Sequence, residues 1–170
     1  DGARHRLQVI QRGARHYART HQAGAGNAAG VGQYGWANAA ALHQGGSRNQ
    51  AVIEQWGRQN LAGTQQLGRN NASRVSQIGI GNTAQSSQTG SNSRLHLVQG
   101  GQGRTANIQQ DQSHMSTLVL QGLFSANSNA MSGSSTYQGG TGQDTLVIQR
   151  DNRTRSARPE VCWSASGRCR

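Results

Sequence analysis

Alternate positions along this chain carry two different kinds of residue, and the pattern repeats every eleven residues. In the segment 49–55, one set of alternate positions holds Asn49, Ala51, Ile53 and Gln55. The other set holds Gln50, Val52 and Glu54. The first set recurs in neighbouring units with similar residues, whereas the second set varies. Because successive side chains of a β-strand point to opposite faces, the recurrent set predicts an inner face and the variable set an outer face.

Three residue types define the repeat, whose unit reads Gln-x-Gly-x-x-Asn-x-Ala-x-x-x-Gln. The glutamines are Gln11, Gln22, Gln33, Gln44, Gln55, Gln66, Gln77, Gln88, Gln99, Gln110, Gln121 and, after a slip of six residues, Gln138 and Gln149. The glycines are Gly13, Gly24, Gly35, Gly46, Gly57, Gly68, Gly79, Gly90, Gly101 and Gly140. The asparagines are Asn27, Asn38, Asn49, Asn60, Asn71 and Asn82. Such fixed-period self-similarity is the signature of a repeat architecture.

The unit divides into a strand and a turn. A strand is predicted over residues 49–55, and the next four residues, 56–59, are predicted to form a turn. Gly57 then supplies a positive φ, or room for close packing. Eleven residues would also fit three helical turns, but the recurrent glycine and the alternation weigh against a helix. We therefore predict an all-β protein, a β-solenoid of stacked strand–turn–strand rungs with two 11-residue units in each rung.

Stacking the rungs at about 4.8 Å would place each inward glutamine over its counterpart, as in cross-β structures. Side-chain amides could then form hydrogen bonds along the axis of the stack. These bonds matter because a buried amide without a partner costs about 1–3 kcal/mol. The small alanines would let the two facing sheets approach to about 10 Å. The sequence therefore predicts that ladders of glutamine and asparagine form the core.

The composition alone would suggest a different class of protein. Hydrophobic residues make up 32% of the chain and aromatic residues 4%, with 24 glycines and one proline. Such a polar chain is typical of disordered segments. A disordered segment, however, has no physical reason to keep one phase over so many units. The period therefore favours a folded solenoid.

The chain is strongly basic, with a net charge of +11, and all 17 of its basic residues are arginine. They gather near the two ends, in residues 1–19 and 150–170. Basic ends could bind an anionic surface such as nucleic acid or lipid headgroups. They could equally keep a β-rich protein soluble and protect its strand edges. No stretch approaches the roughly 20 apolar residues that a membrane-spanning helix needs.

The repeat also divides the chain. We expect a leader at residues 1–4, regular repeats at 5–121, an insertion at 122–131, final repeats at 132–149, and an arginine-rich tail at 150–170. The repeat is worn towards its end, where Arg104 and Met115 replace the asparagine. In the tail, Cys162 and Cys169 either form a disulfide in an oxidising compartment or remain free thiols. The start at Asp1 is compatible with a removed signal peptide.

The candidate chemistry is sparse. His16 occupies an asparagine position and should point inward, whereas His21 should point outward, so the two are not expected to share a metal ion. The acidic residues form no paired-carboxylate motif of the kind that acid–base catalysis uses. The serines lie in no Gly-x-Ser-x-Gly motif. We therefore expect no enzymatic activity, cofactor, metal site or small-molecule substrate.

The repeat unit resembles that of the curlins, the secreted subunits of bacterial curli amyloid fibres. The resemblance covers about residues 5–149 and is strongest over 22–88. The longer family form, Ser-x5-Gln-x-Gly, appears as Ser132, Gln138 and Gly140. Among curlins, the basic charge and the worn final units are most similar to the minor, nucleating subunit.

The resemblance implies a β-solenoid that is exported through the outer membrane and assembles end to end at the cell surface. It implies other curlin subunits as partners, together with curli secretion and outer-membrane anchoring factors, and a role in adhesion and biofilm matrix. The major fibre-forming subunit is the alternative within the family. An arginine-rich solenoid that binds nucleic acid or anionic lipid is the alternative from another class, and its binding should weaken steeply with salt.

Overall fold

The computed structural model describes residues 4–111, 113–122, 134–139 and 144–149. Within these residues every regular element is a strand. One sheet contains β1 (Arg6–Ala14), β3 (Ala28–Trp36), β5 (Gln50–Arg58), β7 (Ala72–Ile80), β9 (Arg94–Gln102), β11 (Ser116–Gln121) and β13 (Asp144–Gln149). The other contains β2 (Tyr17–Ala25), β4 (Ala39–Ser47), β6 (Leu61–Arg69), β8 (Thr83–Ser91), β10 (Thr105–Gln110) and β12 (Ser134–Gly139).

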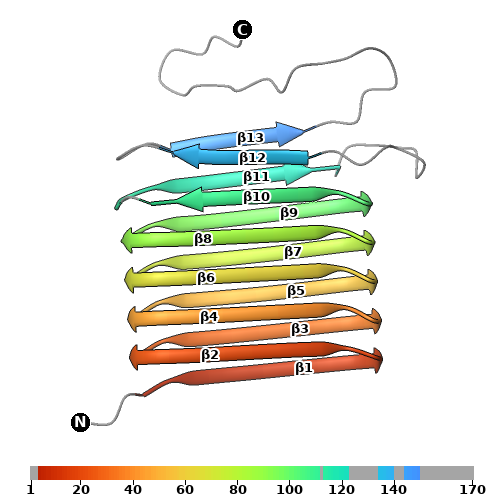
Figure 1. Cartoon of the computed structure of the whole chain (residues 1–170), viewed down its shortest axis with the longest axis horizontal. Coiled ribbons are helices and arrows are strands. Elements are labelled where there is room, and N and C mark those ends of the chain that lie inside the picture. The colour runs from red at the N-terminus through yellow and green to blue at the C-terminus, as the bar shows by residue number, and fades with distance from the viewer. Residues whose placement is uncertain (1–3, 112, 123–133, 140–143, 150–170) are drawn as a thin grey trace, which may run out of the picture.

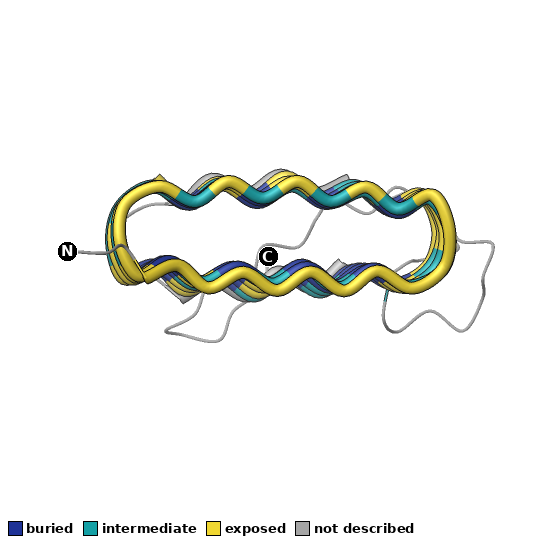
Figure 2. Tube along the Cα trace, turned by 90° about the horizontal axis from the view of Figure 1, so that it is seen from below, coloured by how far each residue is buried: buried dark blue, intermediate teal, exposed yellow. Residues whose placement is uncertain are grey.

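The chain winds as a β-solenoid, passing alternately from one sheet to the other. Neighbouring strands within each sheet are parallel and two units apart in sequence, so that β3 lies between β1 and β5 (Figure 1). From β1 to β11 each residue stands beside the residue 22 positions later, as Gln33 stands beside Gln55. Viewed along the stack, a rung is a flat loop with two long sides (Figure 2). The predicted fold class, with two 11-residue units in each rung, is confirmed.

The core is a thin layer of side chains between the two sheets. In β5, Ala51, Ile53 and Gln55 are fully buried, while the residues between them are partly exposed. The alternation predicted for this segment is therefore observed. The apolar part of the core is made of small and branched residues: Ala29, Val31, Ala40, Leu42, Ala51, Ile53, Ala62, Val75, Ala84, Leu95, Leu97, Ala106, Ile108 and Val119. Aliphatic residues of this size fit between two sheets packed about 10 Å apart.

The turns are shorter than the sequence predicted. The expected four-residue turn at 56–59 is wrong in its bounds, because β5 continues through Arg58 and only two residues separate it from β6. Gly57 keeps its partner in β7 even though its φ is 119°. The glycine therefore bends the strand without ending it, and the chain turns after Arg58, at residues 59 and 60.

Parts of the predicted leader, insertion and tail lie outside the described residues, namely residues 1–3, 123–131 and 150–170.

Candidate functional site: the amide ladders and the first rung

Glutamine side chains form two continuous columns, one in each sheet. In every described pair, Nε2 of one glutamine donates to Oε1 of the glutamine 22 residues later, at 2.7–2.9 Å. The first column contains Gln11, Gln33, Gln55, Gln77, Gln99 and Gln121. The second contains Gln22, Gln44, Gln66, Gln88 and Gln110. Each column is therefore a chain of hydrogen bonds that points in one direction along the stack.

From Gln22 to Gln121, the second hydrogen of each column amide joins the two sheets. Nε2 of Gln55 donates to the backbone carbonyl of Ala39, which begins β4 in the opposite sheet, at 3.0 Å. Nε2 of Gln66 makes the equivalent bond to the carbonyl of Gln50 at 3.0 Å. A glutamine inside the stack thus uses both of its donor hydrogens and its acceptor oxygen. This complete pairing removes the penalty that a buried amide would otherwise carry.

The asparagines also form hydrogen-bonded ladders, which lie at the corners of the rungs. Nδ2 of Asn49 donates to the carbonyl of Gly45 at 2.9 Å and to that of Gly68, in the next rung, at 3.0 Å. Its backbone nitrogen donates to Oδ1 of Asn27, in the preceding rung, at 2.9 Å. Asn27, Asn38, Asn49, Asn60, Asn71 and Asn82 are all buried. The asparagine ladders therefore supply hydrogen bonds to backbone groups at the corners, where the chain passes from one sheet to the other.

The repeat glycines combine a positive φ with close packing, the two reasons that the sequence offered for glycine at this position. Their φ angles, from Gly13 to Gly101, lie between 99° and 128°. A Cβ on Gly57 would also collide with the carbonyl oxygen of Gly79 in the next rung. A side chain at this position would therefore strain the backbone and push adjacent rungs apart.

A second position in the repeat has a positive φ, and the sequence did not predict it. From Gln11 to Gln110, the residue four places after each column glutamine has a left-handed conformation, with φ of 55° at Gln59 and 53° at Asn70. The non-glycine members are Arg15, Ala37, Arg48, Gln59, Asn70, Asn92 and His114. Asparagine and glycine favour this conformation, and Asn70, Gly26 and Gly81 carry that signal. The arginines, alanine and glutamine in the same column obscured it.

Other residues take the asparagine position where the repeat is worn. His16 accepts a hydrogen bond at Nδ1 from the backbone nitrogen of Asn38, at 3.4 Å. Ser93 and Met115 are buried, and the backbone nitrogen of Met115 donates to Oγ of Ser93 at 3.4 Å. Arg104 is also buried, with its Nε donating to the carbonyl of Gly100. The corner therefore accepts side chains of different chemistry while the rungs stay in register.

The last two strands differ from each other in register. In β13, Gln149 stands beside Gln121, at the column position. In β12, Gly139 stands beside Gln110, and the predicted column residue Gln138 stands beside Gln109 instead. The expectation that Gln138 continues the column therefore needs correction, because the slip places it one residue away. Gly140, Cys162 and Cys169 lie outside the described residues.

The first rung is exposed on the side away from β3 and β4. Leu7 and Val9 are 54% and 44% exposed, although they align with the buried residues Ala29 and Val31. Figure 2 views the stack from this end, where the nearest rung is exposed or half-buried and buried positions lie behind it. An apolar inner face is therefore accessible at the N-terminal end of the stack.

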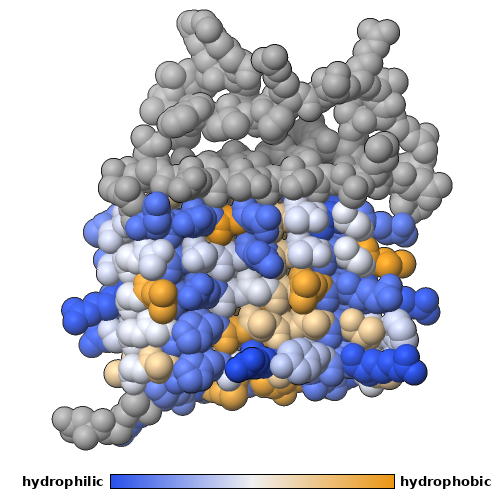
Figure 3. Space-filling view, viewed as in Figure 1, coloured by the Kyte–Doolittle hydropathy of each residue, from blue (hydrophilic) through white to orange (hydrophobic). Residues whose placement is uncertain are grey.

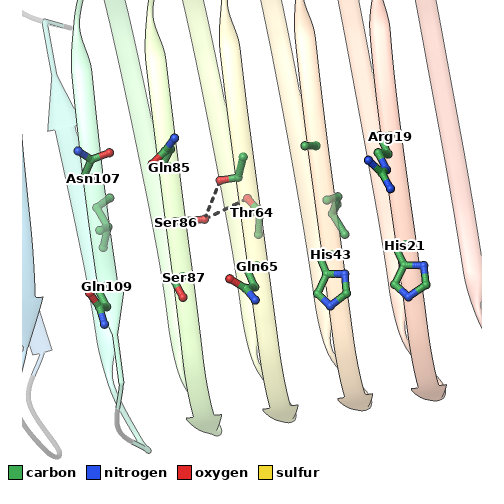
Figure 4. Close-up of a pocket in the computed structure, with 14 residues that line it drawn as sticks. Arg19, His21, His43, Thr64, Gln65, Gln85, Ser86, Ser87, Asn107 and Gln109 are labelled. Carbon is green, nitrogen blue, oxygen red and sulfur yellow. Dashed lines mark hydrogen bonds between the residues drawn. The ribbon is translucent and has the colours of Figure 1, made fainter.

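The outer faces carry shorter ladders. A groove crosses β2, β4, β6, β8 and β10, with Arg19 and the stacked rings of His21 and His43, 5.0 Å apart, at one end (Figure 4). On the other sheet, Tyr34 stacks on Trp56 at 5.4 Å. Arg74 forms an ion pair with Glu54 at 2.7 Å. Polar and apolar residues are mixed on the face shown in Figure 3.

Charge and burial affect one histidine on the outer face. Burial lowers the pKa of His96, and the nearby positive charge of Arg74 lowers this pKa further, while Glu54 opposes the shift. His96 stands beside Arg74 in the register of β7 and β9.

Among the described residues, histidine, cysteine, aspartate and glutamate form no group of three or more that could hold a metal ion.

No family model, curated protein or solved structure matches this chain. In the part of the chain that the structure describes, no helix has the length and apolarity needed to cross a membrane.

Proposed function

We propose that this protein is a secreted structural subunit of a curli-type amyloid fibre, in which it nucleates or templates polymerisation at the bacterial cell surface. Its partners are other subunits of the same kind, added end to end, together with secretion and anchoring factors. The fibre serves adhesion and the biofilm matrix. In this role the protein is not an enzyme and needs no cofactor.

The observation that carries this proposal is the exposed first rung of a uniform stack. Every interface between rungs from β1 to β11 uses the same parallel register and the same glutamine bond, and those from β1 to β9 also share the close approach of glycines. A further rung placed on β1 and β2 would repeat that interface. Because unpaired strand edges template the addition of more strands, growth along the stacking axis is the natural property of such a molecule.

The repeat sequence supports placing this assembly in a curli-type fibre. The residues that match the curlin pattern are those that build the two glutamine columns, the corner asparagines and the close-packed glycines. The resemblance therefore concerns the residues that hold rungs together. The outer residues vary, as is expected where adjacent rungs need only stack.

A seeding experiment tests the nucleating role. Purified protein is added at a small molar ratio to a major curlin, and assembly is followed with a β-sheet-sensitive dye. We expect the lag phase to shorten in proportion to the added protein. An unchanged lag phase would refute nucleation. If the protein alone forms fibres as fast as the major curlin does, the major-subunit role is favoured instead.

A further inference from the structure

We propose that the groove on the outer face of the sheet that contains β2 binds an extended polysaccharide chain that carries carboxylate groups. The groove crosses β2, β4, β6, β8 and β10 and has a volume of about 860 Å³. This volume lies within the range of ligand-binding pockets, about 300–1,000 Å³. The proposal does not depend on the fibre function, because the groove lies on the outer face of one molecule and not at either end of the stack.

Two rows of side chains form the walls of the groove and run along the stack, as Figure 4 shows. One row begins at Arg19 and the other at His21. In the first row, β4 and β6 contribute only Ala41 and Gly63, and a Cβ on Gly63 would meet nothing within 4 Å. Because parallel strands lie about 4.8 Å apart, the five strands extend over about 19 Å. This shape suits an extended chain better than a compact molecule.

The walls of the groove offer hydrogen-bond donors and acceptors that the protein itself does not use. Gln65 and Gln85 are exposed, and within the described residues their side-chain amides have no hydrogen-bond partner. The inner glutamine next in the chain, Gln66, is bonded to both column neighbours and to the backbone. An unpaired side-chain amide can donate and accept hydrogen bonds. Hydroxyl groups do both as well, so a polyhydroxyl chain matches this lining.

The charge of the groove adds a second requirement. Arg19 is exposed and has no acidic partner among the described residues, and no acidic residue lines the groove. An arginine side chain can bind a carboxylate through two parallel hydrogen bonds. The rings of His21 and His43 stack on each other at 5.0 Å, so each ring has one face covered. Because nucleic-acid bases stack on exposed aromatic faces, a carboxylated polysaccharide fits this groove better than nucleic acid does.

Polygalacturonate and its methyl ester test the class of ligand, because esterification removes the charge and keeps the sugar chain. Binding of the full-length monomeric protein to each immobilised polymer is measured at equilibrium. We expect the acid to bind about tenfold more tightly than the ester, the factor for one charge-assisted hydrogen-bonded pair. Equal affinities would show that carboxylates are not recognised and would overturn the proposed ligand class. An absence of binding to both polymers would overturn the proposal as a whole.

A pair of glycine substitutions tests the position of the site without changing the charge of the protein. The control is needed because a chain with a net charge of +11 attracts polyanions nonspecifically. Gly63→Leu fills the groove, whereas Gly30→Leu places the same side chain on the other sheet, where a Cβ would meet only Val52, at 3.7 Å. Neither glycine has a positive φ, so both variants should keep the β-sheet circular dichroism of the wild type.

We expect Gly63→Leu to bind polygalacturonate at least about tenfold more weakly than the wild type, because two or more hydrogen bonds are lost. Gly30→Leu should bind within about twofold of the wild type. If the two leucine variants bind polygalacturonate alike, the polymer binds elsewhere and the proposal is wrong.

A pair of arginine substitutions tests the charged end of the groove. Arg19 lines the groove, whereas Arg58 is also exposed but lies at the end of β5 in the other sheet. Arg19→Gln should lose the preference for the acid over the ester, while Arg58→Gln, with the same net charge, should keep it. Equal effects of the two substitutions would show a nonspecific attraction and would overturn the proposed site. This comparison decides the matter if Gly63→Leu does not fold.

A single-stranded oligodeoxynucleotide serves as the competing ligand. If Gly63→Leu weakens the binding of the oligonucleotide and leaves that of polygalacturonate unchanged, the groove takes nucleic acid and the proposal is wrong. The seeding experiment is independent of these outcomes. A protein that fails to seed fibres but shows the expected contrast between the leucine variants would retain the groove and lose the fibre function. A protein that seeds fibres without this contrast would retain the fibre function and lose the groove.

Discussion

At the scale of single residues, stability depends on whether a polar side chain completes its hydrogen bonds. Gln66 is fully buried and bonded to Gln44, Gln88 and the carbonyl of Gln50. Its chain neighbour Gln65 points to the opposite face and is exposed. The same residue type therefore serves as core at one position and as surface at the next. Adjacent positions of this kind provide an internal control for the ladder.

Replacing one glutamine of this pair should separate the two roles. Gln66→Ala removes three hydrogen bonds and leaves the amide nitrogen of Gln44 and the amide oxygen of Gln88 without their column partner. We expect a loss of about 2–4 kcal/mol in the free energy of unfolding. Gln65→Ala should change it by less than about 0.5 kcal/mol. Urea unfolding of the soluble monomer, followed by circular dichroism, measures both values. Similar losses in the two variants would contradict the ladder.

Glycines offer a second comparison at this scale. Gly57 combines a φ of 119° with the close approach of Gly79, whereas an added Cβ at Gly63 would meet nothing within 4 Å. Gly57→Ala should therefore destabilise the protein by about 2 kcal/mol or more, through backbone strain and separation of the rungs. Gly63→Ala should be neutral, or should stabilise by up to about 1 kcal/mol, because it restricts the unfolded chain. A Gly57→Ala protein as stable as the wild type would show that adjacent rungs are not closely packed at the glycines.

At the scale of strands, the phase of the repeat matters more than the number of residues. Within the regular part of the stack, residues 50–71 form a complete rung. Their removal places Asn49 directly before Ala72, the position that Asn71 occupies in the full chain. Removing one residue inside β5 instead turns part of its inner face outward, because the side-chain period of a strand is two.

Deleting 22 residues should consequently harm the protein less than deleting one. The protein lacking residues 50–71 should keep a β-sheet spectrum and one cooperative unfolding transition. The protein lacking only Val52 should unfold at a clearly lower urea concentration, because either Ala51 or Ile53 loses its inward orientation. Circular dichroism during urea titration compares the two. Greater stability of the single deletion would contradict the phase argument.

The strands also show which part of the fold could be predicted from the sequence. The glutamine spacing predicted the solenoid and the number of units in a rung, because one inner face repeats in every unit. The length of the turn could not be predicted, since it depends on Gly57 bending a strand that remains paired. The register of Gln138 could not be predicted either. After the six-residue slip, the alignment of Gln138 is set by the pairing of β12 with β10, and no residue of the repeat indicates that pairing.

At the scale of the whole molecule, polarity is the main property of the stack. All described strand pairs are parallel, and the hydrogen bonds of both glutamine columns point in one direction. The two ends are therefore chemically different, with acceptors and exposed apolar residues at the first rung. The groove beside His21 and His43 and the stacked rings of Tyr34 and Trp56 lie on the outer faces. They leave the stacking axis free for growth.

In the proposed fibre, the rungs of successive copies continue without a change of spacing or direction. Fibre diffraction from aligned assemblies of the purified protein measures both properties. Stacking of the rungs along the fibre axis predicts a reflection at about 4.8 Å along that axis and one at about 10 Å perpendicular to it. Fibres whose 4.8 Å reflection lies perpendicular to the axis, or assemblies that lack this reflection, would contradict the proposed stacking.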